Sequence, residues 1–558
     1  METNRIWWKE AVVYQIYPRS FYDSNGDGIG DLKGILDKLD YIESLGVDII
    51  WLCPVYQSPN EDNGYDISDY RQIMQEFGSM QQFDELLHSI HRKNMKLIMD
   101  LVANHSSDEH LWFKESRKSK NNPYRDYYFW REGKNGHPPN NWPSFFGGSA
   151  WEIDHQTQEY YLHLFSKKQP DLNWENPKMR KEMYNIIEFW LNKGVDGFRM
   201  DVISVISKEL NFPDANTDNF LDIMNNHYAN GDKVHIYLKE MSHEVLRKYD
   251  IMTVGEGPGI NLDNCLEYVG EDRNELNMIF HFGHMLIDHG SNGRFDPVSW
   301  DLPQFKKIFS DWDNKLKDQG WGSIFLGNHD YPRMVSRFGN DTQYRVESSK
   351  LFATLLLSLR GTPYIYQGDE IGMTNVAFNT IDDYRDIEGT NAWLKAKQEG
   401  KNMVEFLKII HQQGRDNART PMHWSSHQNG GFSKSDPWIK VNPNFHHINI
   451  NAQDKDQNSI LNYYRMMIKF RKKNPTLVYG DYNCLCPEHE SIYAYERWDE
   501  ASKYLILLNI SDNNVVYESP ISRSYQLKIN NYITPNAINK LRPWEAKMFS
   551  LPQGTTSC

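Results

Sequence analysis

The sequence predicts an α/β fold, namely a (β/α)8 TIM barrel with an inserted subdomain after strand 3 and a C-terminal all-β domain. Short apolar runs alternate with stretches of helical apolar spacing, a pattern typical of parallel α/β folds. Three carboxylates lie just past the ends of such runs, where a barrel gathers its catalytic groups. After about residue 480 the pattern changes to short strands separated by turn residues.

The expected elements follow one another in barrel order. The expected strands are 12–17, 47–52, 95–99 and, as the eighth, 361–367, and buried apolar runs at 194–196, 251–254 and 323–326 lead into the three carboxylate motifs. The expected helices are 36–45, 83–90, 181–191 and 460–472. In the tail, strands are expected at 491–495, 504–508 and 546–549.

Two long stretches interrupt this alternation. Residues 104–173 are rich in Pro, Gly, Asn and aromatics, and a stretch this long within a compact domain is usually functional. We interpret it as a small subdomain over the mouth of the barrel, and we expect a second irregular stretch at 373–451. The predicted domains are therefore a barrel at 1–103 and 174–480, the insertion at 104–173, and a C-terminal β-sandwich at 481–558.

Composition excludes several classes of function. The net charge of −14 disfavours a nucleic-acid or anionic-membrane surface. No stretch reaches the roughly 18 apolar residues of a membrane span, and the first ten residues lack the apolar core of a secretory signal. The five cysteines are few, odd in number and scattered, which favours a reducing compartment, the cytoplasm. The expected partner is a small molecule, and the expected state is a monomer or homodimer.

The three carboxylates differ in their settings. Asp201 follows Arg199 by two residues, so on a strand both side chains face the same way, and the guanidinium favours an ionised carboxylate, as a nucleophile requires. Glu256 lies between two glycines, which let backbone and substrate approach closely. Asp330 ends the polar triplet 328–330. Each alone fits a structural ion pair, a turn or a cap, and only their shared position at strand ends indicates catalysis.

Four motifs carry a resemblance to a known family: 100–105 (Asp-Leu-Val-Ala-Asn-His), 197–202, Glu256 in its glycine setting, and 328–330. With them, the chain resembles the α-amylase family of glycoside hydrolases over nearly its whole length. The resemblance implies Asp201 as nucleophile, Glu256 as general acid/base, and Asp330 as a third acid that binds and distorts the sugar. It also implies that the reacting sugar is contacted by His105, Arg199 and His329.

Further segments are similar to the oligo-1,6-glucosidase (isomaltase) group of that family. They are 62–66, 169–174, 414–421 and the pairing of Asp201 with Val202, which is associated with α-1,6 preference. By this resemblance, Asp62 and Arg415 hold the far hydroxyls of the terminal glucose and Tyr65 stacks on its ring, while Phe146 and Gln169 also contact substrate. The implied enzyme is a retaining exo-α-glucosidase that cleaves α-1,6 and also α-1,4 bonds of short oligosaccharides. Glu256 must then carry a proton near neutral pH.

Residues 23–31 are similar to a calcium-binding loop. Oxygen ligands stand at positions 1, 3, 5 and 9, with glycine at position 6. Position 12 is Gly34 instead of a glutamate, so the loop is not a complete EF-hand. Relatives of the group bind a structural calcium or magnesium here, which favours a stabilising ion over a solvated acidic turn. The expected ligands are Asp23, Asn25, Asp27, Ile29 and Asp31, and no catalytic cofactor is expected.

Three alternatives are weighed against this interpretation. A sucrose isomerase shares the fold and triad, but segment 286–290 lacks arginine, and Val202 stands where those enzymes have threonine. An α-1,4-glucosidase stays open, because Gly257 and Tyr331 depart from the usual isomaltase residues. Catalytically dead partners of amino-acid transporters carry a membrane anchor and lose catalytic carboxylates, whereas this sequence shows no such anchor and keeps the carboxylates.

Overall fold

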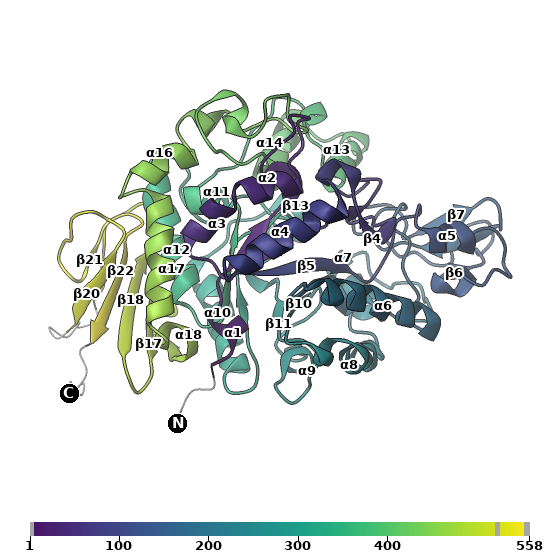
Figure 1. The fold of residues 1–558 in the computed structure, drawn as a ribbon, viewed down its shortest axis with the longest axis horizontal. Coiled ribbons are helices and arrows are strands. Elements are labelled where there is room, and N and C mark those ends of the chain that lie inside the picture. Colours follow the sequence, from purple (N-terminus) through teal and green to yellow (C-terminus); the bar gives the residue numbers. More distant parts are fainter. Residues whose placement is uncertain (1–4, 519–524, 552–558) are drawn as a thin grey trace.

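The computed structural model describes residues 5–518 and 525–551, and its centre is a nearly closed barrel of eight parallel strands (Figure 1). In chain order the strands are β1 (Val13–Ile16), β2 (Ile49–Leu52), β5 (Lys96–Val102), β9 (Gly197–Asp201), β10 (Met252–Glu256), β11 (Met278–Phe280), β14 (Ser323–Ile324) and β15 (Thr362–Tyr366). The sheet runs from β11 through β10, β9, β5, β2, β1 and β15 to β14. Between its two ends, Ser323 Oγ donates to the Ile279 carbonyl at 2.7 Å.

Several barrel helices begin or end at capping residues that the sequence supplies. They include α4 (Met80–Arg92), α6 (Pro177–Lys193), α8 (Val234–Glu244), α10 (Leu302–Leu316), α12 (Arg345–Ser358) and α17 (Ile460–Lys473). Ser79 and Gln82 form a capping box at the start of α4. Gly194, with φ of 103°, ends α6 in the left-handed region. The helix expected at 36–45 divides at Lys38 into α2 (Leu32–Asp37) and α3 (Leu39–Leu45).

The apolar run 351–359 belongs to α12, which is buried on nearly every side between the barrel and the C-terminal sheet. A helix that is apolar all round needs such an environment. Within the two described ranges, no helix combines the length and apolarity that a membrane crossing requires.

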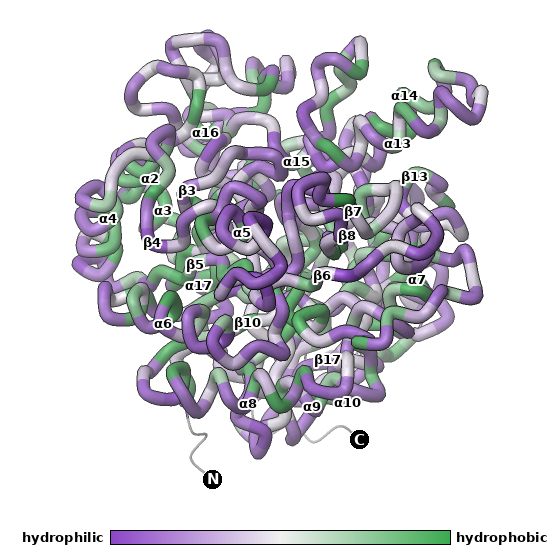
Figure 2. Tube along the Cα trace, turned by 90° about the vertical axis from the view of Figure 1, so that its right-hand side faces the viewer, coloured by the Kyte–Doolittle hydropathy of each residue, from purple (hydrophilic) through white to green (hydrophobic). Residues whose placement is uncertain are grey.

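Residues 104–173 lie at the end of the molecule opposite the C-terminal sheet (Figure 1) and face the viewer in Figure 2. They contain α5 (Leu111–Ser116) and a three-stranded sheet of β6 (Trp130–Arg131), β8 (Glu159–Leu162) and β7 (Trp151–Asp154). Their apolar cluster, which includes Trp142 and Leu164, also takes in Val202 and Val205 after β9. The insertion is therefore anchored next to the end of the strand that carries Asp201.

The stretch expected to be irregular at 373–451 contains several helices, so that expectation was wrong. They are α13 (Ile387–Gln398), α14 (Met403–Gln413), α15 (Asp416–Arg419) and α16 (Ile450–Lys455). α13 and α14 pack against each other and project at the upper right of Figure 2. Asp386 caps α13 by accepting from the backbone N–H groups of Glu388 and Gly389. Polar surfaces and weak apolar spacing hid these helices from the sequence argument.

The C-terminal region forms a five-stranded antiparallel sheet in the order β16 (Asp481–Cys484), β17 (Ile492–Trp498), β18 (Lys503–Asn509), β22 (Ala546–Leu551) and β20 (Gln526–Asn530). A smaller pair, β19 (Val515–Val516) with β21 (Lys540–Leu541), shares an apolar cluster with one face of this sheet. Tyr493, Tyr495 and Ile506 on the other face join the barrel core. Cys558 and the end of the predicted 481–558 domain lie outside the described residues.

Buried arginines join the barrel to this sheet through backbone carbonyls. Arg497 is 0% exposed and donates to the carbonyls of Ser358, Thr476, Leu477, Val478 and Gly480. Arg471 binds the carbonyl of Leu477 as well, together with those of Leu357 and Leu359 at the end of α12. Burial, with repulsion from Arg497, lowers the pKa of Arg471 to about 9, and burial, with repulsion from Arg360, contributes to lowering that of Arg497 to about 10. The carbonyls at helix ends supply the partial negative charge that these cations need.

We predict that Arg497→Met lowers the free energy of unfolding by about 3 kcal/mol or more, because several buried carbonyls lose their donor together. Lys503→Met on the neighbouring strand is the control, since its ammonium pairs with Glu496 at a partly exposed position and should cost less than about 1 kcal/mol. Calorimetric melting of both variants measures the difference. Equal shifts in melting temperature would show that Arg497 does not anchor the sheet.

Candidate active site

Asp201, Glu256 and Asp330 lie together at the carboxyl ends of the barrel strands. Asp201 is the last residue of β9, Glu256 is the last residue of β10, and Asp330 follows β14. Their side chains are 9%, 11% and 22% exposed, so each carboxylate faces a narrow opening. Parallel strands gather these groups because all their carboxyl ends point to one face of the barrel.

A single guanidinium holds three carboxylates at this face. Arg199 Nη1 lies 2.7 Å from Asp201 Oδ1, and its Nη2 lies 2.7 Å from Glu256 Oε2. Arg199 Nη1 also contacts Asp100, which is fully buried on β5. Three acids around one buried cation carry an excess of negative charge if all are ionised. The three carboxylates therefore compete for one buried positive charge.

This setting shifts the pKa of Asp201. Burial raises the pKa of Asp201 well above its ordinary range, Arg199 opposes this shift, and the charges of Glu256 and Asp100 add to it. The sequence argument expected Arg199 to keep Asp201 ionised. The structure corrects it, because burial and the two further carboxylates that share the guanidinium outweigh the effect of Arg199.

Val202 adopts an unusual backbone conformation directly after Asp201. Its φ of 36° and ψ of 42° lie in the left-handed region, which is a genuine outlier for a β-branched residue. The side chain is 7% exposed and belongs to the apolar cluster of the insertion. The backbone N–H of Val202 donates to Glu256 Oε2 at 3.1 Å. The strained turn thus fixes one oxygen of Glu256, and the surrounding packing holds the strain.

Asp330 lies in a cationic setting. Arg419 Nη2 lies 2.8 Å and Arg415 Nη1 3.2 Å from its Oδ1, while His329 Nε2 lies 3.0 Å from its Oδ2. Burial works to raise its pKa, but His329, Arg415 and Arg419 together hold the pKa of Asp330 well below its ordinary range. Asp330 is therefore an ionised acceptor, in contrast to Asp201, whose pKa is raised.

His329 is fully buried between the rings of neighbouring residues. Its Nε2 lies 2.6 Å from the Tyr65 hydroxyl, and the two rings are nearly parallel with centroids 5.3 Å apart. The guanidinium of Arg199 lies 5.7 Å from the centroid of the Tyr65 ring. The resemblance implies a direct sugar contact for His329, and in the structure its Nε2 lies beside Tyr65 and Asp330.

The remaining predicted binding residues form the far wall of the site. Arg415 Nη2 lies 3.3 Å from Asp62 Oδ1, and the Arg415 guanidinium lies 5.1 Å from the centroid of the Phe146 ring. Gln169 Nε2 donates to Asp62 Oδ2 at 3.4 Å and lies 3.2 Å from His105 Nε2. Burial lowers the pKa of His105 to about 4, so this imidazole is neutral. The structure thus places all of the expected substrate-binding residues around one opening.

Sequence reasoning missed several groups at this site. Asp386 lies 2.8 Å from Arg415 Nε, and Arg294 donates to the Asp330 carbonyl at 2.8 Å from the hairpin of β12 (His289–Gly290) and β13 (Gly293–Pro297). Arg294 also pairs with Glu388 at 3.1 Å. The missed residues are Asp100, Arg294, Asp386, Glu388 and Arg419. The signal in the sequence was the pair of arginines at 415 and 419. Two such cations close together need carboxylate partners from other parts of the chain.

The loop at 23–31 folds around its own carboxylates. Asp23 Oδ1 accepts from the backbone N–H groups of Asn25 and Gly26, and its Oδ2 accepts from Gly28 N at 2.8 Å. Asp31 accepts from Gly34 N at 2.7 Å and so caps α2. In the part of the chain that the structure describes, no three His, Cys, Asp or Glu side chains come together as a metal-binding group.

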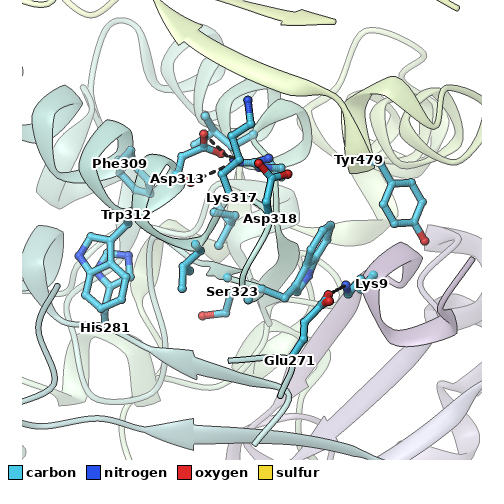
Figure 3. A pocket seen from close by; sticks show the side chains of 17 residues that line it. Lys9, Glu271, His281, Phe309, Trp312, Asp313, Lys317, Asp318, Ser323 and Tyr479 are labelled. Atoms are coloured by element: carbon cyan, nitrogen blue, oxygen red, sulfur yellow. Dashed lines mark hydrogen bonds and ion pairs between the residues drawn. The ribbon is translucent and has the colours of Figure 1, made fainter. Parts of the chain in front are cut away.

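A separate cavity of about 290 Å³ lies at the opposite end of the strands (Figure 3). Trp312 and Lys317 of the α10 region line it, together with Lys9, which pairs with Glu271 at 3.0 Å. Ser323 at its floor is the first residue of β14, whereas Asp330 follows the end of that strand. The cavity is therefore remote from the catalytic carboxylates and is not the reaction site.

Comparisons with known proteins agree with this geometry. Residues 15–480 match the sequence model of the α-amylase catalytic domain. The chain is 54% identical over 557 residues to an oligo-1,6-glucosidase of Parageobacillus thermoglucosidasius, covering 98% of this chain and 99% of that protein. It is 47% identical over 553 residues to an alpha-glucosidase of Pediococcus pentosaceus, with 98% and 99% covered.

A solved structure extends the comparison to the whole fold. A mutant isomaltulose synthase from Erwinia rhapontici NX5, in complex with its natural substrate sucrose, superimposes with a TM-score of 0.95 at 46% identity. The match covers 99% of this chain and 100% of that one. The barrel, the strand-end carboxylates and these matches together show that the chain belongs to the α-amylase family of glycoside hydrolases.

Proposed function

We propose that the protein is a retaining, exo-acting α-glucosidase that hydrolyses terminal α-1,6 and also α-1,4 glucosidic bonds of short oligosaccharides such as isomaltose. The arrangement around Arg199 carries this proposal, since two carboxylates at the ends of adjacent strands share one guanidinium. The names of the relatives support it, because an oligo-1,6-glucosidase and an alpha-glucosidase match nearly the full chain.

The proposed reaction is a double displacement. Asp201 attacks the anomeric carbon while Glu256 donates its proton to the leaving oxygen, and a covalent glucosyl-enzyme forms. Glu256 then takes a proton from water, which attacks the same carbon and releases α-glucose. Retention requires carboxyl groups about 5–5.5 Å apart, and contact of both with Arg199 keeps them side by side. Glu256 must hold the proton that it delivers, and Asp201 must be ionised when it attacks.

The far wall supports exo action. Arg415 bridges Asp62, Asp386 and Asp330, so the opening is closed beyond the position of one sugar ring. A longer chain of sugars would have to displace this buried network, which would leave charged groups unpaired. The terminal glucose therefore fits with its far hydroxyls against the wall and its anomeric carbon toward Asp201.

Sucrose isomerisation is the second candidate, and the structure revises the argument against it. That argument used the absence of arginine from residues 286–290. The β12–β13 hairpin nevertheless brings Arg294 against the Asp330 carbonyl, with its guanidinium 4.8 Å from the centroid of the Tyr331 ring. A sucrose-bound isomaltulose synthase is also among the similar structures. Hydrolysis stays the main proposal. Against the isomerase, it is now supported by Val202, which stands where those enzymes have threonine.

We also propose that the protein acts in the cytoplasm as a monomer or homodimer. The four described cysteines, Cys53, Cys265, Cys484 and Cys486, are all unpaired, which suits a reducing compartment. The proposed stabilising cation, calcium or magnesium, would bind at Asp23, Asn25, Asp27, Ile29 and Asp31. The spacing of the loop supports this, and Asn25 and Asp27 are exposed residues that solvent ions can reach.

The mechanism is tested by Asp201→Ala and Glu256→Gln. Each is expected to lower kcat on a chromogenic α-glucoside by about 10²–10⁴-fold, because each removes a group that acts on the reacting bond. Glu405→Gln on exposed α14 is the control and should leave kcat unchanged. Circular dichroism verifies that all three fold. A folded variant of Asp201 or Glu256 with near wild-type turnover would refute the assigned roles.

Linkage preference is tested by comparing rates on isomaltose, maltose and sucrose, with products identified. Val202 directly follows Asp201, and we place its side chain beside the path of the leaving sugar. Val202→Ala, which removes both methyl groups, is expected to raise the maltose rate relative to isomaltose by about 10–200-fold, the range available to steric discrimination. Wild-type enzyme that is already faster on maltose would contradict the α-1,6 preference. Isomaltulose as the main product from sucrose would establish the second candidate.

The cation is tested by chelation. If the loop binds calcium or magnesium, excess chelator should lower the melting temperature by mass action, with turnover at low temperature unchanged. Asp27→Ala should lower the melting temperature to a similar extent and remove the response to chelator. A melting curve that chelator does not move, in protein free of bound metal by elemental analysis, would reject the proposal.

A further inference from the structure

Gln15 lies behind the catalytic groups and has no role in the steps derived above. It is the third residue of β1, is 1% exposed, and stands in register between Trp51 on β2 and Tyr366 on β15. Its side-chain Nε2 lies 2.8 Å from His329 Nδ1 and 3.3 Å from Cys53 Sγ. The amide therefore meets the imidazole on the side opposite Asp330.

The partners of His329 decide which ring nitrogen carries the proton. Asp330 is ionised by its contacts with Arg415 and Arg419, so it can only accept a hydrogen bond. The Nε2 atom of His329, 3.0 Å away, must then be the donor. In a neutral imidazole the other nitrogen is an acceptor, and the group that faces it is the amide NH₂ of Gln15.

The other groups around the ring do not compete for this proton. Tyr17 stacks on the imidazole, with ring centroids 6.0 Å apart, and Tyr65 contacts Nε2. Burial raises the pKa values of Tyr17, Tyr65 and Cys53, so all three are neutral. Arg419 Nε reaches only the backbone carbonyl of His329. Asp330 is thus the one ionised group that meets the ring nitrogens, and Gln15 is the group that faces Nδ1.

We propose that Gln15 is a positioning residue for glycoside cleavage: its amide donates to His329 Nδ1 and holds the imidazole in the Nε2–H tautomer that Asp330 and Tyr65 require. Without this donor, Asp330 alone favours the Nε2–H tautomer, and the imidazole loses the contact that fixes its orientation. A ring that rotates, or that carries its proton on Nδ1, would turn the lone pair of Nε2 toward the ionised Asp330 and repel it. Because Asp330 and His329 border the sugar that is distorted during reaction, the effect should reach kcat more than KM.

The test compares Gln15→Met with wild-type enzyme on a chromogenic α-glucoside, and it rests on the proposed glucosidase function. Methionine has a similar length and shape but no donor. We expect kcat to fall by about 10–100-fold, the usual effect of a residue that orients a catalytic group, with KM changed much less. Gln367→Met is the matched control. Gln367 is also a fully buried amide, but it binds Tyr17 N and the Ser20 carbonyl and should alter stability without altering kcat.

A second variant, Gln15→Glu, distinguishes a role in orienting His329 from a role in packing. It tests the proposal even if the methionine variant does not fold. A carboxylate facing Nδ1 favours a doubly protonated ring, which still donates from Nε2. We expect this variant to keep a larger share of kcat than Gln15→Met and to show a moved alkaline limb in its kcat/KM profile against pH. An unmoved profile, or a methionine variant whose kcat stays within about twofold of wild type, overturns the proposal. An inactive wild-type enzyme would instead reject the glucosidase function itself.

Discussion

The contact of one buried guanidinium with three carboxylates is the constraint on which the site depends. Arg199 binds Asp100, Asp201 and Glu256 at once and is 1% exposed. Such a cluster is costly unless every member is paired, so the surrounding barrel must hold the four side chains in one geometry. Burial and the neighbouring acids outweigh Arg199, so the pKa of Asp201 is raised. Acid catalysis depends on environments of this kind, which shift the pKa values of carboxyl groups.

On the opposite side of the site, around Asp330, positive groups surround the carboxylate. Asp330 meets two arginines and a histidine, and Arg415 links it to Asp62 and Asp386. Cations hold the pKa values of Asp330 and Asp386 below their ordinary range, whereas burial and neighbouring acids raise that of Asp201 beside Arg199. Two carboxylate environments with opposed pKa shifts thus stand within one narrow site. Asp201 meets one arginine, whereas Asp330 meets two. This difference in nearby arginines, and not a difference between the carboxylates, sets the direction of the pKa shifts.

Strain and packing maintain this arrangement. Val202 holds a left-handed conformation because the apolar cluster of the insertion encloses its side chain, and its N–H is thereby directed at Glu256. The insertion thus does more than cover the mouth of the barrel. It stabilises the turn that follows the strand bearing Asp201, which links the packing of residues 104–173 to the position of the catalytic acid.

The sequence by itself determined the barrel and the positions of the three acids. Apolar runs at 12–17, 47–52 and 361–367 became β1, β2 and β15, because buried parallel strands need continuous apolar residues. The motifs at the strand ends then had to meet at one face of the sheet. Local spacing was enough for these inferences, since each depends on residues close together in the chain.

Only the tertiary structure decided the electrical state of the site and the identity of its distant partners. The helices within 373–451 were not expected, so Asp386 and Glu388 could not be assigned to Arg415 and Arg294. The pKa of Asp201 is raised, against expectation, because the site is buried and two further acids share Arg199. Those acids meet Arg199 only because three strands converge. A sequence motif shows only which two groups are adjacent in the chain, whereas a pKa depends on every charge around the group. The full set of neighbouring charges is defined only once the chain has folded.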